Sequence, residues 1–283
     1  MITLVSFASS NMKKTLARLG KEAEESGFFD RVVLLTEKNF DSDYWSEYGD
    51  FMLSNPRGYG FYLWKSYCCK KALEELNDGD FLVYLDAGCE VNKYGRKRFD
   101  DYLNIAKSSP MGFCVFRNDN LLEKCWTKGD VFDFFDEGLE SNLANSDQLL
   151  GGIFVVYVSP VSRELISEWY NTVHQHLSLI TDAPSVAPCS DAFIENRHDQ
   201  SVFSVLLKKR GITSLSGWEV QSHPATNQRL SLLRYNPFLA IRNRTGNPRL
   251  NKLQRKFLPL CNWYWYWTYQ LVCWLRTQYH RFV

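Results

Sequence analysis

Short apolar runs alternate with longer polar stretches along most of the chain. Residues 2–8 and 32–36 are rich in aliphatic and β-branched side chains, and the polar stretch 11–26 between them has the composition of a helix. This order is the spacing of a βαβ unit. The pattern continues with a helix over 61–76, a turn with the sequence Asn-Asp-Gly-Asp, and a buried strand over 81–85.

Further strands are predicted over 112–116 and 152–158, and further helices over 163–179 and from Asp199 onward. Continuous apolar strands separated by helices are typical of a sheet that is covered on both faces. We therefore predict an α/β fold with an open, mostly parallel sheet flanked by helices. In such sheets ligands bind outside the carboxyl ends of the strands, so residues that follow a strand are the first candidates for a site.

The charges are unevenly distributed along the chain. It has 283 residues, 45% of them hydrophobic and 23% charged, which suits one large globular domain. The net charge is only +1, yet the first 219 residues carry 23 Lys and Arg against 32 Asp and Glu, whereas the last 64 carry ten Lys and Arg and no acid. A basic tail on an acidic body indicates that the tail meets an anionic surface.

The cysteines point to a reducing compartment. The eight cysteines show no CxxC pair and no metal-ligand spacing, which predicts a cytoplasmic protein with most of these thiols buried. The first residues, MITLVSFASS, contain no basic segment before their apolar run, so we expect a first strand there and not a secretory signal.

Three segments carry candidate chemistry. The strand 81–85 leads into Asp86-Ala87-Gly88, where a carboxylate can hold Mg²⁺ or Mn²⁺ shared with a diphosphate and the glycine lets backbone approach a ligand. The alternative is an aspartate that caps a turn. Residues 57–65, RGYGFYLWK, combine aromatic rings with two cations, which suit a bound sugar or nucleotide, although an aromatic core helix has the same composition.

The third segment is RHDQSVFSVLL, residues 197–207. His198, Asp199 and Gln200 stand at the start of an amphipathic helix, where the unpaired N–H groups favour an anion. The alternative is simple N-capping by Asp199.

Taken together, the segments RGYGFYLWK, LVYLDAGCEVN, LLGGIFVV and RHDQSVFSVLL resemble a family of glycosyltransferases with the GT-A fold, found in polysaccharide loci of bacteria and in large viruses. The resemblance covers about residues 1–245 and implies one catalytic domain that binds a nucleotide-sugar through a DxD motif and a metal. Asp86 matches the first carboxylate of that motif. Gly88 stands where the second is expected, so one carboxylate suffices, or Glu90 or a histidine completes the shell, or no metal is needed.

The same resemblance implies roles for further residues. Asp199 and Gln200 would be catalytic, and Gly151-Gly152 would line the donor sugar. The basic loop around 241–246 could close over the diphosphate. The expected cofactor is Mn²⁺ or Mg²⁺, with Asp86 and His223 as candidate ligands. The residues expected to bind the nucleotide-sugar are Arg57, Lys65, Asp86, Gly88, Gly152, Arg242 and Arg244.

The last segment, 246–283, is predicted to be a basic, aromatic helical extension. Its run 257–275 is uncharged and holds four of the nine tryptophans, but it also contains Pro259 and Asn262. Trp and Tyr prefer the membrane–water interface, and the flanking bases favour anionic lipid. We therefore expect an interfacial anchor and not a spanning helix. The alternative is a helix packed on the domain.

These observations predict a hexosyltransferase-like enzyme, peripheral on the cytoplasmic face of a membrane. It would move a sugar from a nucleotide-sugar to a glycan or lipid-linked acceptor in surface polysaccharide or glycan synthesis. No pattern for nucleic-acid binding is present. One alternative is a non-catalytic carbohydrate- or nucleotide-binding module with a degenerate DxD motif. A sugar nucleotidyltransferase would require a glycine-rich phosphate loop after the first strand, and residues 6–10 are not one.

Overall fold

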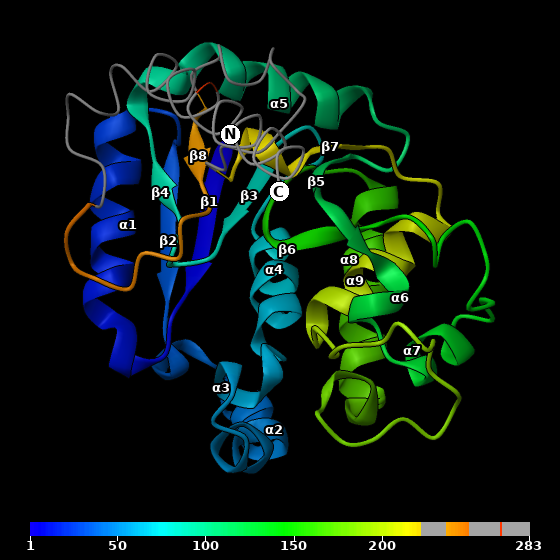
Figure 1. Cartoon of the computed structure of the whole chain (residues 1–283). Coiled ribbons are helices and arrows are strands. Elements are labelled where there is room, and N and C mark those ends of the chain that lie inside the picture. Colours follow the sequence, from blue (N-terminus) through cyan, green and yellow to red (C-terminus); the bar gives the residue numbers. More distant parts are fainter. Residues whose placement is uncertain (222–235, 249–266, 268–283) are drawn as a thin grey trace, which may run out of the picture.

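The computed structural model describes residues 1–221, 236–248 and 267. A six-stranded sheet forms its centre, with the strands in the order β2-β1-β3-β6-β5-β7 (Figure 1). Strand β6 is antiparallel to both of its neighbours, and the other five strands run in one direction. The strands of this sheet are β1 (Ile2–Phe7), β2 (Arg31–Leu35), β3 (Phe81–Leu85), β5 (Phe113–Leu122), β6 (Asp147–Tyr157) and β7 (Ser214–Ser216).

Helices cover both faces of the sheet, because successive side chains of the apolar strands point to opposite faces. On β3, Leu82 and Tyr84 join a core with helices α2, α4, α8 and α9, while Val83 and Leu85 join a second core with α1 and α5. The helices are α1 (Lys13–Ser26), α2 (Ser42–Ser54), α3 (Gly58–Phe61), α4 (Trp64–Glu74), α5 (Arg96–Ser108), α6 (Glu123–Trp126), α7 (Gly129–Phe134), α8 (Pro160–Gln175) and α9 (Asp199–Lys209).

A second, two-stranded sheet joins a late part of the chain to the turn that follows β3. Strand β4 (Glu90–Val91) pairs antiparallel with β8 (Phe238–Leu239). Figure 1 shows the two strands side by side next to α1. This pairing brings the residues just after β8 to the carboxyl edge of β3.

The predicted fold class is confirmed: the sheet is open, mostly parallel and flanked by helices. Two boundaries differ from the prediction in ways that matter for the site. The strand expected over 152–158 begins at Asp147, so both glycines of the LLGG segment lie inside β6. The helix expected from residue 61 begins at Trp64, because residues 58–62 adopt a left-handed conformation.

The predicted extension 246–283 lies outside the described residues, apart from 246–248 and Trp267. Within the part of the chain that the structure describes, no helix is long and apolar enough to cross a membrane. The six cysteines in that part are free thiols, and four of them are buried.

Candidate active site

Asp86 is the first residue after β3 and lies at the carboxyl edge of the parallel strands. Its Oδ1 accepts a hydrogen bond of 2.8 Å from the hydroxyl of Tyr84, a side chain with no exposed surface. The Asp86 side chain itself keeps 42% of its surface exposed. The Asp86 carboxylate is therefore held in position by Tyr84 while part of its surface stays accessible to a ligand.

Lys65 reaches the same place from the start of α4. Its side chain is buried, and the ammonium Nζ lies 2.9 Å from Oδ2 of Asp199 and 3.6 Å from Oδ1 of Asp86. Nζ also donates to the Gly151 carbonyl at 3.1 Å. Two carboxylates from distant parts of the chain thus share one ammonium group, and we call these three residues the Lys65 cluster.

The electrostatics of the cluster follow from burial and from this sharing. Burial by itself lowers the pKa of Lys65, but the carboxylates of Asp199 and Asp86 outweigh it and hold that pKa above its ordinary value. Burial raises the pKa of Asp199 to about 6, although the Lys65 ammonium opposes the rise. The Lys65 ammonium is close to two carboxylates, whereas the Asp199 carboxylate is close to one ammonium and also to the like charge of Asp86. Asp199 is consequently ionised above about pH 6, next to a protonated lysine.

Asp199 begins α9, and its side chain is directed to Lys65. The N-cap residue by backbone conformation is His198, which makes no side-chain capping hydrogen bond, and the Asp199 carboxylate pairs with Lys65. His198 has a φ of +56°, a conformation that non-glycine residues rarely adopt. Its Nδ1 lies 2.8 Å from the Ile180 carbonyl and therefore carries the ring proton. Burial lowers the pKa of His198, which keeps the ring neutral at pH 7.

The segment before Lys65 is a run of five residues in the left-handed region. The φ angles from Gly58 to Tyr62 are +61°, +53°, +81°, +52° and +65°. A Cβ on Gly58 would lie 2.5 Å from the Tyr62 ring, and one on Gly60 would lie 2.6 Å from Met52. The three other residues of the run carry side chains, and each costs about 1–2 kcal/mol in this conformation. Such strain is typical of functional segments, and here it immediately precedes Lys65.

The two glycines of β6 let its backbone approach the cluster. A Cβ on Gly152 would lie 2.6 Å from Oδ2 of Asp86, and one on Gly151 would lie 3.0 Å from the side chain of Gln200. Gln200 accepts from the Gly151 amide at 3.1 Å and donates to Oε1 of the buried Gln148 at 2.7 Å. Any larger residue at 152 would thus displace the Asp86 carboxylate, and Gln200 is held in a fixed orientation beside Gly151.

The loop that follows β8 lies against the turn after Asp86. The amide of Asn243 donates to the Gly88 carbonyl at 2.8 Å, and the Asn243 side chain donates to Oε1 of Glu90 at 2.6 Å. Asn243 is fully buried, while its neighbours Arg242 and Arg244 are exposed. The basic loop predicted to close over the site is therefore docked on the Gly88 turn.

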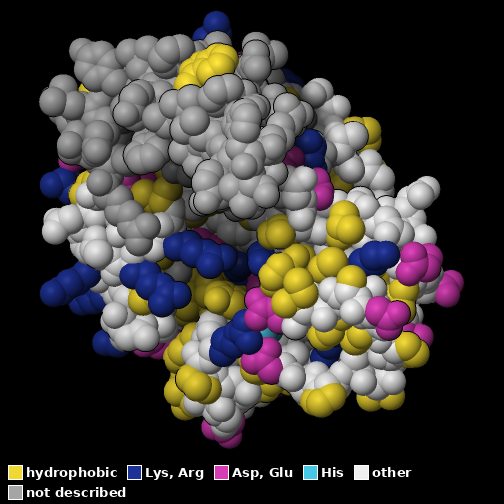
Figure 2. All heavy atoms as spheres, in the orientation of Figure 1, with side chains coloured by type: hydrophobic (Ala, Val, Ile, Leu, Met, Phe, Trp, Pro, Cys, Tyr) yellow, Lys and Arg dark blue, Asp and Glu magenta, His cyan; other side chains and the backbone are white. Residues whose placement is uncertain are grey.

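The structure brings some predicted residues together and engages others elsewhere. Lys65, Asp86, Gly152, Asp199 and Gln200 form one connected group. Arg57 instead forms ion pairs with Asp182 at 3.1 Å and Glu195 at 3.0 Å on the loop before α9. Figure 2 shows Lys and Arg side chains gathered near the centre of this face, next to a smaller group of Asp and Glu side chains.

The donor set at Asp86 can be compared with the two-carboxylate metal site that a DxD motif implies. Position 88 has no side chain, so it offers no second carboxylate, and the Cα of Arg242 lies 3.4 Å from where a Cβ there would be. Glu90 is fully buried and binds Asn243, and Asp199 pairs with Lys65.

No group of three or more His, Cys, Asp or Glu side chains within residues 1–221, 236–248 and 267 is placed to hold a metal ion. The other candidate ligand, His223, lies outside these residues. Because position 88 is a glycine, the described side chains do not form the two-carboxylate site of a DxD motif, and the mechanism proposed below is derived from the side chains of the protein itself.

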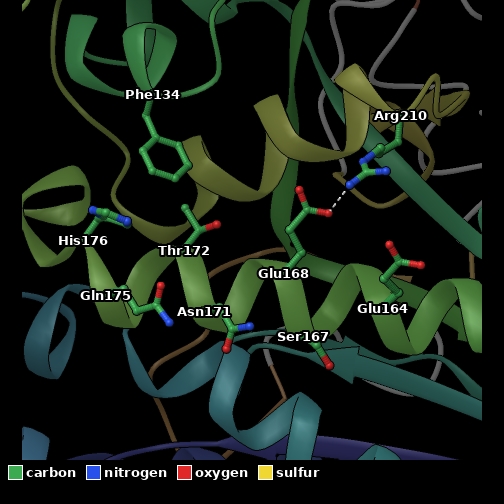
Figure 3. A pocket seen from close by; sticks show the side chains of 9 residues that line it. All are labelled: Phe134, Glu164, Ser167, Glu168, Asn171, Thr172, Gln175, His176 and Arg210. Carbon is green, nitrogen blue, oxygen red and sulfur yellow. Dashed lines mark hydrogen bonds and ion pairs between the residues drawn. The ribbon is translucent and has the colours of Figure 1, made fainter.

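Sequence reasoning missed two contributors. Tyr84 positions Asp86, and the only signal for it was its place two residues earlier in the same strand. Arg197 stacks on Trp126, which follows β5, and no spacing in the sequence links those two positions. A separate pocket lies on α8, between Phe134 and Arg210 (Figure 3). It contains an ion pair of 2.5 Å between Glu168 and Arg210 but none of the residues of the Lys65 cluster.

Comparison with known proteins gives similarity at the level of structure only. No family model matches the chain, and no curated protein matches it. One similar solved structure is a glycosyltransferase involved in the glycosylation of the major capsid of PBCV-1, with 10% identity, a TM-score of 0.48, and coverage of 92% of this chain and 98% of that chain.

Two further similar structures have lower TM-scores. The galactosyltransferase LgtC, in complex with donor and acceptor sugar analogs, has 15% identity, a TM-score of 0.39, and coverage of 77% of this chain and 74% of that chain. The apo form of GlyE from Streptococcus pneumoniae has 12% identity, a TM-score of 0.42, and coverage of 98% of this chain and 63% of that chain. All three structures are of glycosyltransferases.

Proposed function

We propose that the protein is a glycosyltransferase that moves a hexose from a nucleotide-sugar to a glycan or lipid-linked acceptor. The observation that carries this proposal is the Lys65 cluster, in which a buried ammonium joins Asp199 to the exposed Asp86 at the carboxyl edge of the sheet. The motif resemblance supports the same reaction. It assigns Asp86 to the donor side and Asp199 to the reacting centre.

Such a transfer requires charge stabilisation above all. The bond between the anomeric carbon and the diphosphate oxygen breaks, and its electron pair leaves with the nucleoside diphosphate. The acceptor hydroxyl oxygen bonds to that carbon, and its proton passes to a base. Fixed cations that face the departing diphosphate lower the barrier because they stabilise charge that develops in the transition state. The basic loop is suited to this role. The Lys65 ammonium is already engaged by two carboxylates and by the Gly151 carbonyl, so its part is to hold those carboxylates in place.

Asp199 is the proposed partner of the reacting centre. Its carboxylate is buried, and its pKa of about 6 makes it ionised at neutral pH while it keeps enough basicity to take a proton. The same negative charge would also stabilise positive charge that develops on the sugar ring. Gln200, held by Gln148 and Gly151, would orient the sugar beside it.

We further propose that the enzyme acts at the cytoplasmic face of a membrane, in surface polysaccharide or glycan synthesis. The support is the sequence of the last 64 residues, which combine ten Lys and Arg with a dense group of tryptophans and no acidic residue. A lipid-linked acceptor would be presented at such a surface.

Binding of the donor can be tested before any acceptor is known. A panel of nucleotide-sugars is added to the purified protein, with and without EDTA, and the midpoint of thermal unfolding is measured. A ligand that binds only the native state raises that midpoint. We expect one donor class to raise it for the wild type with or without EDTA, and to raise it less for Asp86→Asn. Asp133→Asn, an exposed aspartate of α7, is the matched control.

The second candidate is a binding module without turnover, which the glycine at position 88 favours. It predicts the same thermal shift but no release of nucleoside diphosphate from any donor. No shift with any nucleotide-sugar would contradict both candidates.

A further inference from the structure

Arg197 stands two residues before Asp199, a member of the Lys65 cluster. Its guanidinium stacks on the ring of Trp126, with Cζ 4.1 Å from the ring centroid. The Arg197 amide also donates to the Trp126 carbonyl at 3.1 Å and to the Ser201 hydroxyl at 3.1 Å. The backbone and the side chain of Arg197 are thus both fixed against neighbouring elements.

The charge of Arg197 lacks a carboxylate partner in the described part of the chain. None of the ion pairs among those residues includes Arg197, and its Nε is buried without a hydrogen-bond partner there. Glu195 acts on it electrostatically, but that carboxylate is held by Arg57 at 3.0 Å. A buried guanidinium atom without a partner is costly unless a ligand supplies the acceptor.

Arg242, in the loop that follows β8, is near enough to Arg197 for its charge to act on the Arg197 guanidinium. The backbone of Arg242 lies against Gly88, at the turn that follows Asp86. Burial lowers the pKa of Arg197, and the nearby charge of Arg242 lowers it further. Two like charges that interact from separate segments are typical of a site for an anion with more than one negative charge.

We propose that Arg197 and Arg242 together bind a phosphate or diphosphate group of a substrate, over the site that contains Asp86 and Asp199. This inference rests on the proposed function for the identity of the substrate. A guanidinium whose face is covered by an indole ring presents its edge, and the edge carries the N–H groups that match phosphate oxygens in pairs. The group comes either from the donor nucleotide or from a phosphorylated acceptor.

The first test measures anion binding and needs no turnover. Titration calorimetry with inorganic pyrophosphate is performed on the wild type, Arg197→Gln, Arg197→Lys and Arg242→Gln. We expect the dissociation constant to rise roughly 10- to 100-fold in the two glutamine variants, as for the loss of charged hydrogen bonds. Arg197→Lys keeps the charge but loses the paired geometry, so its affinity should be intermediate. Arg210→Gln, in the separate pocket on α8, is the control.

The source of the phosphate is distinguished in a second set of titrations. Weaker binding of nucleoside diphosphates in the Arg197 variants assigns the site to the donor. Weaker binding of a short alkyl diphosphate in the presence of saturating nucleoside diphosphate assigns it to a lipid-linked acceptor. Either result supports the proposal.

Unchanged affinity for pyrophosphate and for both diphosphate probes in Arg197→Gln and Arg197→Lys, with thermal midpoints at the wild-type value, would overturn the anion site and leave the proposed glycosyltransferase standing. If the affinities fall as expected but no nucleotide-sugar is ever turned over, the proposed function fails and the anion site remains.

Discussion

The buried pair between Lys65 and Asp199 should couple the stability of α4 to that of α9, and a double-mutant cycle measures this directly. Removing one partner of a buried ion pair costs about 3–5 kcal/mol, because the other charge remains buried. Lys65→Met leaves two carboxylates without their ammonium, so we expect about 3 kcal/mol of destabilisation. Asp199→Asn leaves Lys65 near Asp86 at 3.6 Å and removes a carboxylate whose ionised form burial disfavours, so its cost should be well below that of Lys65→Met.

The double variant Lys65→Met/Asp199→Asn removes both charges and should cost less than the sum of the single variants by about 2 kcal/mol. Unfolding by urea at pH 7.5, followed by circular dichroism, gives the four free energies of unfolding. The exposed pair Arg96 and Asp100 has the same distance of 2.9 Å and serves as the control cycle. Its coupling should stay below about 0.5 kcal/mol. If the buried cycle were additive to within about 0.5 kcal/mol, the two charges would not interact as described.

Four other consequences can be measured separately. Because burial raises the pKa of Asp199 to about 6, kcat/KM should rise with pH through about 6, and a profile that is flat from pH 5 to 7 would argue against Asp199 as the ionised group. The free energy of unfolding of the wild type, relative to that of Asp199→Asn, should be greatest below the unfolded-state pKa of 3.8 and should decline as pH rises through about 6, because the native state binds the Asp199 proton more tightly than the unfolded state does. Urea unfolding at several pH values measures this difference. A difference that grows with pH would contradict the prediction. Gly152→Ala should lower turnover roughly 100-fold by displacing Asp86, as measured by diphosphate release. Gly138→Ala, where a Cβ would meet open space, should not lower it. Equal activity in the two variants would refute the argument that the backbone at Gly152 must lie close to Asp86. Deleting residues 250–283 should release the protein from anionic vesicles while donor hydrolysis persists, and the anchor idea fails if the full chain does not sediment with such vesicles or if the deletion unfolds the domain.

The elements of the fold could be predicted wherever one local pattern decided them. The run before Asp86 is apolar enough to be a buried strand whatever surrounds it, and the apolar face after Asp199 predicts a helix by itself. The left-handed segment 58–62 could be predicted only in part. Gly58 and Gly60 suggest unusual backbone, but Tyr59 prefers right-handed angles and is held in the other region by its tertiary contacts.

The candidate site was predictable residue by residue but not as an arrangement. Asp86 and Asp199 were identified because each stands at the end of an element. That both would meet one buried lysine depends on how α4 and α9 pack, which no spacing in the chain encodes. Arg57 looked equivalent to Lys65 in the same motif, yet it pairs with acidic residues of the loop before α9. Arg197 lay inside a recognised motif, but its stacking on Trp126 is a purely tertiary contact.

The most direct test of the account is the release of nucleoside diphosphate from a panel of nucleotide-sugars by the wild type, Asp86→Asn and Asp199→Asn. The account predicts release from at least one donor by the wild type. Asp199→Asn should retain donor affinity but lose roughly 100-fold or more in kcat, since a group that acts in the transition state is missing. Asp86→Asn should lose donor affinity. Folded wild-type protein that releases nothing from any donor, or an Asp199→Asn variant with near-normal kcat, would contradict the central claim.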